Sequence, residues 1–156
     1  MLKTAARELN RRFLEQIPLT GQIGLEITGY DGTTLIMEAP LAANINDKGT
    51  GFAGSIAALA TLAGWALITL WLEERRGPVG VAVYRSEMRY RRPITGDFFA
   101  RTCLPAKEEL EKMLSDLDKK GRGRLELTVT VCQEASEAVD FKGTYAVRLS
   151  GKTAET

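Results

Sequence analysis

Hydrophobic and polar residues alternate at every second position in six stretches of the chain, which is the period of a β-strand. Between residues 84 and 91, for example, tyrosine, serine and methionine alternate with arginine and glutamate. Such a strand buries one face and exposes the other, so the pattern predicts an antiparallel sheet. The predicted strands are residues 23–29, 33–41, 79–92, 97–104, 125–132 and 141–149.

Two other stretches have the longer period of an amphipathic helix. In residues 4–16 the apolar stripe is Ala5, Leu9, Phe13 and Ile17. In residues 106–119, which follow Pro105, it is Leu110, Met113, Leu114 and Leu117. We expect both helices to lie on the surface, because their other faces are polar.

Residues 51–72 carry no charge at all, so this stretch is long enough to cross a membrane. Glycine, serine and threonine dilute it, and acidic and basic residues are mixed on both flanks, without the excess of positive charge that orients membrane helices. We therefore predict a core helix over residues 54–74 and no contact with a membrane. Its small residues Ala53, Ala57, Ala60 and Gly64 form one track, which predicts close approach of another backbone.

The order of elements is helix, two strands, buried helix, two strands, surface helix, two strands. This order predicts an α+β protein with the hotdog fold, in which an antiparallel sheet of about six strands wraps around one long buried helix. We expect a single domain over residues 1–156, with a frayed tail at 150–156.

Composition narrows the chemistry that the chain can perform. It contains no histidine, which excludes a histidine base and histidine metal ligands, and the two cysteines are too isolated to form a metal site. Cys103 and Cys132 fit reduced thiols in the cytoplasm, and the charged N-terminus does not look like a secretory signal. With a net charge of +1 and no nucleic-acid motif, we expect no nucleic-acid partner.

Three segments also resemble a known family. "APLAANINDKGTGFAGSIAALATLAGWAL", "RSEMRYRRPITGD" and "KKGRGRLELTVTV" are similar to the YiiD C-terminal family of thioesterase-like hotdog domains, over about residues 15–150. The resemblance implies an acyl-thioester ligand bound by a homodimer, or by a dimer of dimers. It also implies coenzyme A or acyl carrier protein as the carrier of the acyl group, with no resident cofactor.

Hydrolysis of a thioester needs hydrogen-bond donors for the carbonyl oxygen and an activated water. The N-terminus of a helix supplies such donors, because its first amides are unpaired. Gly51, Phe52, Ala53, Gly54 and Ser55 lead into the predicted core helix, so we assign them to the site. The alternative is an ordinary helix entry in which Ser55 is the N-cap.

Asn46 and Asp47 are the polar residues just before this helix. Asn46 could orient a water or hold the thioester, and Asp47 is the candidate general base. The alternative for both is a turn, in which asparagine, aspartate and glycine are common.

The related phenylacetate-pathway type of hotdog thioesterase has an asparagine, a His-Gly-Gly helix entry and an acid on the helix. Placed on this sequence, that pattern matches Asn46, puts residues 52–54 at His-Gly-Gly and puts Thr61 at the acid. Because the histidine and the acid are missing, a non-catalytic protein that binds acyl thioesters is the alternative function. Thr61 could position a water, or its hydroxyl could bond to the preceding turn.

Basic residues are the last signal. Arg85, Ser86 and Arg89 lie on one predicted strand, and Arg122 lies in a basic turn. They could bind the phosphates of coenzyme A or an acidic carrier protein, or they could be solvated surface. The sequence distinguishes neither the acyl chain length, nor coenzyme A from carrier protein, nor a dimer from a tetramer.

Overall fold

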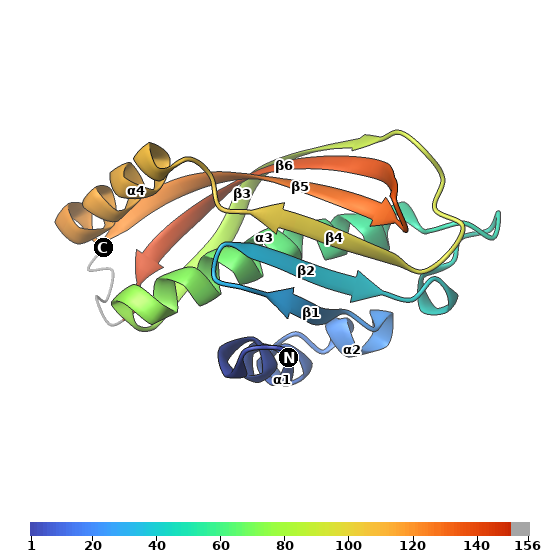
Figure 1. The fold of residues 1–156 in the computed structure, drawn as a ribbon, viewed down its shortest axis with the longest axis horizontal. Helices are drawn as coiled ribbons and strands as arrows, with labels where there is room; N and C mark the ends of the chain where they lie inside the picture. Colours follow the sequence, from blue (N-terminus) through green and yellow to red (C-terminus); the bar gives the residue numbers. More distant parts are fainter. Residues whose placement is uncertain (151–156) are drawn as a thin grey trace.

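The computed structural model describes residues 1–150 and contains one antiparallel sheet that curves around a long helix, α3 (Figure 1). The strand order is β1-β2-β4-β5-β6-β3, so β1 and β3 are the edges. The strands are β1 (Glu26–Tyr30), β2 (Thr34–Ala39), β3 (Val79–Tyr90), β4 (Phe98–Cys103), β5 (Arg122–Gln133) and β6 (Ser136–Leu149). The predicted hotdog fold is confirmed, whereas the tail beyond Ser150 lies outside the described residues.

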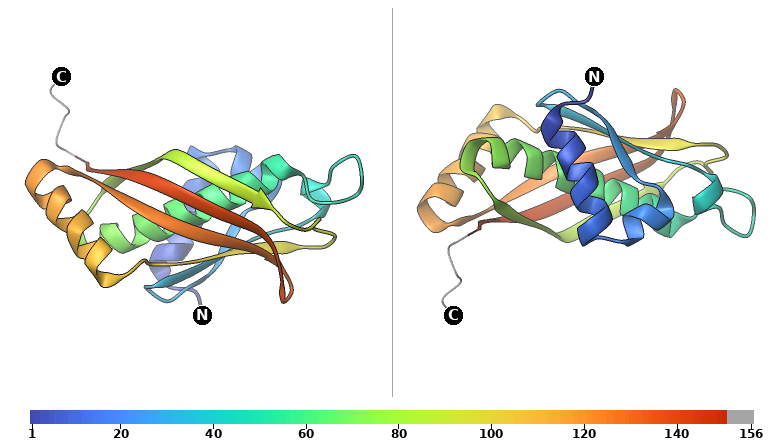
Figure 2. Two further views of the ribbon diagram at one scale, coloured as in Figure 1. Left: turned by 90° about the horizontal axis from the view of Figure 1, so that it is seen from above. Right: turned by 90° about the horizontal axis from the view of Figure 1, so that it is seen from below.

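The helices are α1 (Thr4–Gln16), α2 (Leu19–Ile23), the short 3-10 helix η1 (Ala42–Asn44), α3 (Ala53–Arg76) and α4 (Lys107–Lys120). Seen from below, α1 crosses the open side of α3, the side that the sheet leaves uncovered (Figure 2). The contact includes the rings of Phe13 and Trp65, whose centroids are 5.6 Å apart. Of the predicted stripe on α1, Ala5 is exposed and Ala6 is buried in its place.

The prediction was wrong about the start of the first strand. Ile23 ends α2, and Gly24 then adopts the left-handed conformation that commonly ends a helix. The alternation at residues 23–25 therefore belongs to a helix end, and pairing begins only at Glu26. In the same way, Leu41 lies beyond β2, and β6 begins at Ser136 rather than at residue 141.

Helix α3 is the centre of the core. It is long and apolar enough to cross a membrane, but 72% of its most apolar window is buried inside the fold. Leu59, Leu67 and Ile68 are fully buried against the sheet. The prediction of a core helix is confirmed, since the sheet and α1 supply the apolar surroundings that lipid would otherwise provide.

The small residues of α3 have a more local role than predicted. The Tyr145 hydroxyl on β6 donates a 2.7 Å hydrogen bond to the carbonyl of Thr61, and its ring lies over Gly64. A side chain, and not another backbone, makes the close approach. Ala53 is exposed and Ala57 only half-buried, so the predicted track contacts the sheet only in its second half.

This contact predicts that Gly64→Ala destabilises the fold. A Cβ at residue 64 would lie 2.3 Å from the Tyr145 oxygen, so Tyr145 would have to move. We expect a loss of about 1–3 kcal/mol in the free energy of unfolding, measured with urea. Gly80→Ala is the matched control, since the nearest atom to its new Cβ is 4.0 Å away. Equal stability of the two variants would contradict the prediction.

Candidate functional site

The N-terminus of α3 is an open set of backbone donors. The first hydrogen bond of the helix runs from the Ile56 amide to the Phe52 carbonyl, at 3.1 Å. The amides of Ala53, Gly54 and Ser55 come before it and have no acceptor within the helix. No side chain caps this terminus, and no acidic residue lies in its first turn. The partial positive charge of the helix end is therefore available to a ligand.

A buried asparagine fixes the chain that enters this helix. The Asn44 side-chain amide donates to the carbonyls of Ile23 (2.8 Å) and Pro40 (2.7 Å). The Asn44 carbonyl accepts a 2.7 Å hydrogen bond from the Phe52 amide. Asn44 thus holds both ends of the loop before α3. Sequence reasoning missed it, although it lies two residues before Asn46 in the same motif.

Asn46 organises the turn itself. Its side-chain oxygen accepts hydrogen bonds from the amides of Lys48 (2.9 Å) and Thr50 (3.0 Å), and its nitrogen donates to the Thr50 hydroxyl (2.9 Å). The Asp47 side chain is 81% exposed and forms a 3.1 Å ion pair with the equally open Lys48. Within one chain, the structure therefore shows Asn46 bonded within the loop and Asp47 open to solvent.

The two predicted glycines give the loop room to pack. A Cβ on Gly54 would lie 2.6 Å from the Phe52 ring, and one on Gly51 would lie 3.2 Å from Ile56 and Ile94. Ser55 is the third residue of α3 and is buried, so the alternative in which it caps the helix is wrong. The N-cap residue is Phe52, which is 54% exposed and lies directly before the free amides.

The end of strand β3 also contacts the N-terminus of α3. Tyr90, near its end, donates a 3.2 Å hydrogen bond from its hydroxyl to the Ala53 carbonyl. Tyr90 was not among the predicted site residues. The alternation of β3 could have indicated its position, because it puts Tyr90 on the same face of the strand as Ser86 and Met88. This face looks toward α3, since the residues of β6 that pair with these three are buried on that side: Gly143, Phe141 and Val139.

The other predicted residues are dispersed. Arg85 and Arg89 alternate with the α3-facing residues of β3 and so lie on the outer face of the sheet. Arg122 begins β5, after the turn that ends α4, at the opposite end of α3. Thr61 lies on the half-exposed flank of α3, and its carbonyl accepts the Tyr145 bond. The structure thus brings together residues 46–55 with Tyr90.

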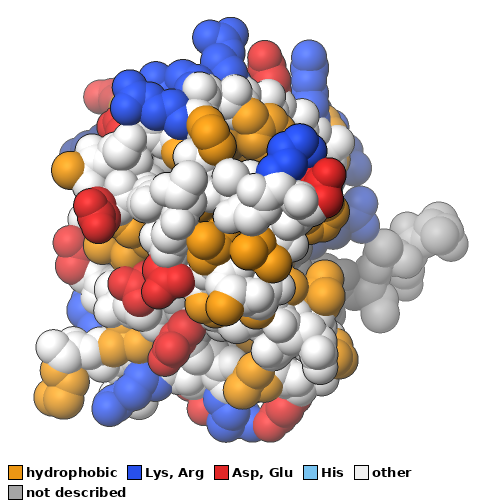
Figure 3. Space-filling model, turned by 90° about the vertical axis from the view of Figure 1, so that its right-hand side faces the viewer, with side chains coloured by type: hydrophobic (Ala, Val, Ile, Leu, Met, Phe, Trp, Pro, Cys, Tyr) orange, Lys and Arg blue, Asp and Glu red, His pale blue; other side chains and the backbone are white. Residues whose placement is uncertain are grey.

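The end of the molecule that holds the start of α3 also exposes hydrophobic side chains. Figure 3 shows hydrophobic side chains gathered near its middle, with charged groups around them. Ile45 in the loop before α3, Phe52 at the N-cap of α3 and Tyr90 at the end of β3 are all exposed. An acyl chain could therefore lie against apolar side chains next to the free amides of α3.

Metal chemistry has no support in the part of the chain that the structure describes. Residues 1–150 contain no cluster of three or more histidine, cysteine, aspartate or glutamate side chains that could hold a metal ion. Both cysteines are free thiols there, Cys103 exposed and Cys132 buried. Burial raises the pKa of the Cys132 thiol, which lowers its reactivity.

Comparisons with known proteins show which family and which fold the chain shares. Residues 6–149 match the family described as "Putative thioesterase (yiiD_Cterm)". A protein of unknown function from Chlorobaculum tepidum is 33% identical, with a TM-score of 0.85 over 92% of this chain and 93% of that one. A "probable thioesterase" from Pseudomonas aeruginosa is 25% identical, with a TM-score of 0.77 over 91% and 95% of the two chains.

A "putative thioesterase" from Shewanella oneidensis shares the fold at 22% identity, with a TM-score of 0.79 over 91% of this chain and 96% of that one. Because the family match covers nearly the whole chain, the relationship does not depend on the fold alone. The chain belongs to the YiiD C-terminal family, which is described as "Putative thioesterase".

Proposed function

We propose that the chain hydrolyses acyl thioesters, with the carbonyl polarised by the backbone amides at the N-terminus of α3. The observation that carries the proposal is the uncapped start of this helix, where the amides of Ala53, Gly54 and Ser55 are free and no acidic residue lies in the first turn. A negative charge that develops on the carbonyl oxygen during attack by water would be stabilised there. Family membership supports the same class of reaction.

The proposed reaction needs water, a proton acceptor and no resident cofactor. Water attacks the thioester carbon, the carbon–sulfur bond breaks, and the thiolate leaves and takes up a proton. Asp47 is the proposed general base, because it is the carboxylate nearest in sequence to the free amides and is accessible to water. Asn46 keeps the loop that carries Asp47 in shape through its bonds to Lys48 and Thr50.

The proposed substrate is the thioester of coenzyme A or of acyl carrier protein. Arg85, Ser86, Arg89 and Arg122 are the proposed contacts to its carrier. Two free cysteines support a cytoplasmic location, where thiols stay reduced. The second candidate function is binding of acyl thioesters without hydrolysis, and it is favoured by the absence of a histidine and of an acid at position 61.

We also propose that two chains associate through β3. This strand has 12 residues, lies at the edge of the sheet and is exposed on both faces between residues 82 and 87. An edge of this length offers unpaired backbone groups to a second copy. Because Tyr90 joins β3 to the start of α3, a partner on this edge would lie next to the proposed site.

The role of the amides predicts losses of activity of very different size for two changes at one residue. Ser55→Asp places a carboxylate in the first turn of α3, where it competes with the developing oxyanion. We expect thiol release from acyl-coenzyme A to fall by about 10²-fold or more, as when an oxyanion donor is lost. Ser55→Asn introduces a side chain of nearly the same size as aspartate but without its charge, so this variant should lose far less activity.

Circular dichroism of both variants shows whether they are folded. A folded Ser55→Asp variant as active as Ser55→Asn would refute polarisation by the helix end. Measurable acyl-coenzyme A binding by the unaltered chain, without thiol release, would select the non-catalytic function instead.

The role of Asp47 predicts that Asp47→Asn lowers turnover and preserves binding. The amide keeps the size and polarity of the carboxylate but takes up no proton, so we expect a fall in kcat of about 10²–10⁴-fold. Asp116→Asn, on α4, is the control for loss of one acidic charge. If Asp47→Asn turns over substrate as fast as the unaltered chain, Asp47 is excluded as the base. The remaining mechanism is then attack by water on the polarised carbonyl without help from Asp47.

Association through β3 predicts that Val83→Asp lowers the mass measured by light scattering from that of a dimer toward that of a monomer. Val83 is 37% exposed in the middle of this edge, and a charge there would have to be buried between the two copies. Leu19→Asp is the control, since Leu19 is a more exposed hydrophobic residue, on α2. A monomeric mass for the unaltered chain at micromolar concentration would contradict the proposal.

A further inference from the structure

The peptide group between Ala53 and Gly54 differs from its neighbours at the start of α3. Its N–H is one of the three free amides, and its carbonyl accepts the 3.2 Å hydrogen bond from the Tyr90 hydroxyl. The same carbonyl also accepts the helical bond from the amide four residues further on, because α3 begins at Ala53. It therefore has two donors, one for each lone pair of the carbonyl oxygen.

The other two free amides lack this support in the described part of the chain. The Ala53 amide shares its peptide group with the Phe52 carbonyl, which accepts the helical bond from Ile56 at 3.1 Å and no bond from a side chain. The Ser55 amide shares its peptide group with the Gly54 carbonyl, to which no side chain donates either. Of the three free amides, only that of Gly54 is coupled to a side chain.

A donor at the oxygen of a peptide group strengthens the N–H at its other end. Resonance in the peptide moves electron density from the nitrogen to the oxygen. A hydrogen bond that stabilises negative charge on the oxygen therefore makes the N–H of the same group a better donor, and linked hydrogen bonds strengthen one another in this way. The bond from Tyr90 thus favours the Gly54 amide over the other two as a donor to a negatively charged oxygen.

The ring of Phe52 packs closely beside the same amide. A Cβ on Gly54 would lie 2.6 Å from this ring, so the ring can take this position only because residue 54 has no side chain. An apolar ring at this distance keeps part of the water away from the backbone of Gly54. A hydrogen bond is stronger where less water surrounds it, because the effective dielectric constant is lower.

We propose that Tyr90 is a positioning residue of the thioester site, which makes the Gly54 amide the principal donor to the carbonyl oxygen of the ligand. The inference rests on the proposed function, which supplies that carbonyl. It adds a dependence of the site on the edge of the sheet. Because Tyr90 is the last residue of β3, this strand must be in place before the strongest donor is formed.

The test is Tyr90→Phe, which removes the hydroxyl and keeps the ring. We expect kcat for hydrolysis of acyl-coenzyme A to fall by about two- to tenfold, which corresponds to the usual net strength of one hydrogen bond. Tyr90 is 48% exposed, so water can partly replace its hydroxyl and a larger loss is not expected. KM should change less than kcat, because the carbonyl oxygen becomes charged only during the attack.

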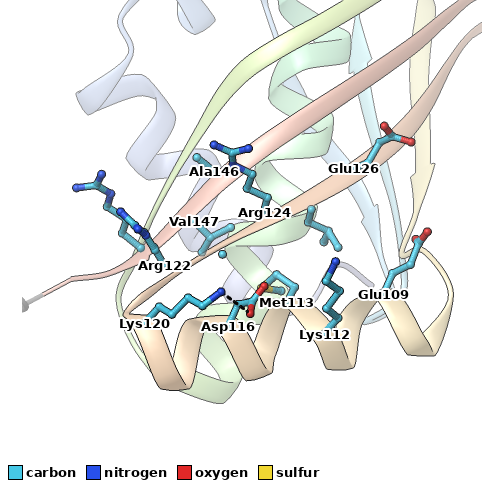
Figure 4. A pocket seen from close by; sticks show the side chains of 13 residues that line it. Glu109, Lys112, Met113, Asp116, Lys120, Arg122, Arg124, Glu126, Ala146 and Val147 are labelled. Atoms are coloured by element: carbon cyan, nitrogen blue, oxygen red, sulfur yellow. Dashed lines mark ion pairs between the residues drawn. The ribbon is translucent and has the colours of Figure 1, made fainter.

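Tyr84→Phe is the matched control on the same strand. Tyr84 is 53% exposed, and its hydroxyl forms no hydrogen bond within residues 1–150. The centre of its ring lies 4.7 Å from the guanidinium of Arg124, which lines the hollow of about 640 Å³ beside α4 (Figure 4). The kcat and KM of this variant should equal those of the unaltered chain.

Nuclear magnetic resonance of the amides reports the same contact without a substrate. The amide nitrogen and proton shifts of Gly54 should change more in Tyr90→Phe than those of Ala53 and Ser55, because only the Gly54 peptide loses a donor. A purely structural role for Tyr90 would instead move all three amides together and lower the urea midpoint of unfolding. That result would overturn the inference even if kcat falls.

The inference and the proposed function fail in different ways. An active unaltered chain with the same kcat as Tyr90→Phe would overturn the role of Tyr90 and leave hydrolysis standing. If the unaltered chain binds acyl-coenzyme A without hydrolysis, Tyr90→Phe should weaken binding of this thioester but not of S-alkyl coenzyme A, which has no carbonyl. Equal weakening of both ligands, or of neither, would overturn the inference, and no binding of acyl-coenzyme A at all would overturn both proposals.

Discussion

The burial of α3 inside the sheet is the constraint on which the rest of the molecule depends. A helix that is apolar on all sides must be enclosed, and six strands with α1 enclose it. The hydrogen bond from Tyr145 to the Thr61 carbonyl, with the Tyr145 ring over Gly64, fixes how the helix lies on β6. Burial also raises the pKa of the Tyr145 hydroxyl, which keeps it protonated as a donor.

Because the sides of the helix are enclosed, its unpaired backbone groups lie only at its two ends. The two ends differ in what surrounds these groups. At the start, the loop held by Asn44 leaves three amides free and open. At the end, Arg75 and Arg76 lie in the last turn, where positive charge suits the helix dipole. The free amides and this basic last turn thus lie about one helix length apart.

The edge strand β3 connects these two regions. Tyr90, the last residue of β3, bonds to Ala53 at the start of α3, and Tyr84 lines a hollow on the sheet together with Arg124 of β5. Residues on alternate sides of the strand face α3 or the outer surface, so one strand contributes to both regions. A second copy paired along β3 would bring the two regions of different chains closer, since antiparallel strands run in opposite directions.

The sequence by itself determined the elements, because period-2 and period-3.6 patterns report directly which face of a strand or helix is buried. It also determined that the uncharged stretch is a core helix, since glycines, threonines and mixed flanking charges suit a protein interior. It failed at Ile23, where two apolar residues at strand spacing belong to a helix end. Of the two interpretations of Ser55, the structure excludes the N-cap, because this residue lies inside α3.

Only the tertiary structure decided which residues meet. Tyr90 and Tyr145 are 37 and 84 residues away from the residues to which they donate, so no local pattern shows these contacts. Asn44 likewise reaches Ile23, which lies 21 residues before it. The sequence offered Arg85 and Arg122, in two separate basic clusters, as contacts to the carrier of the substrate. Only the structure shows that Arg85 lies on the outer face of the sheet and Arg122 at the opposite end of α3 from the free amides of the same chain. The physical reason is that periodicity fixes the direction of a side chain relative to its own element, whereas distances between elements depend on how the sheet closes around the helix.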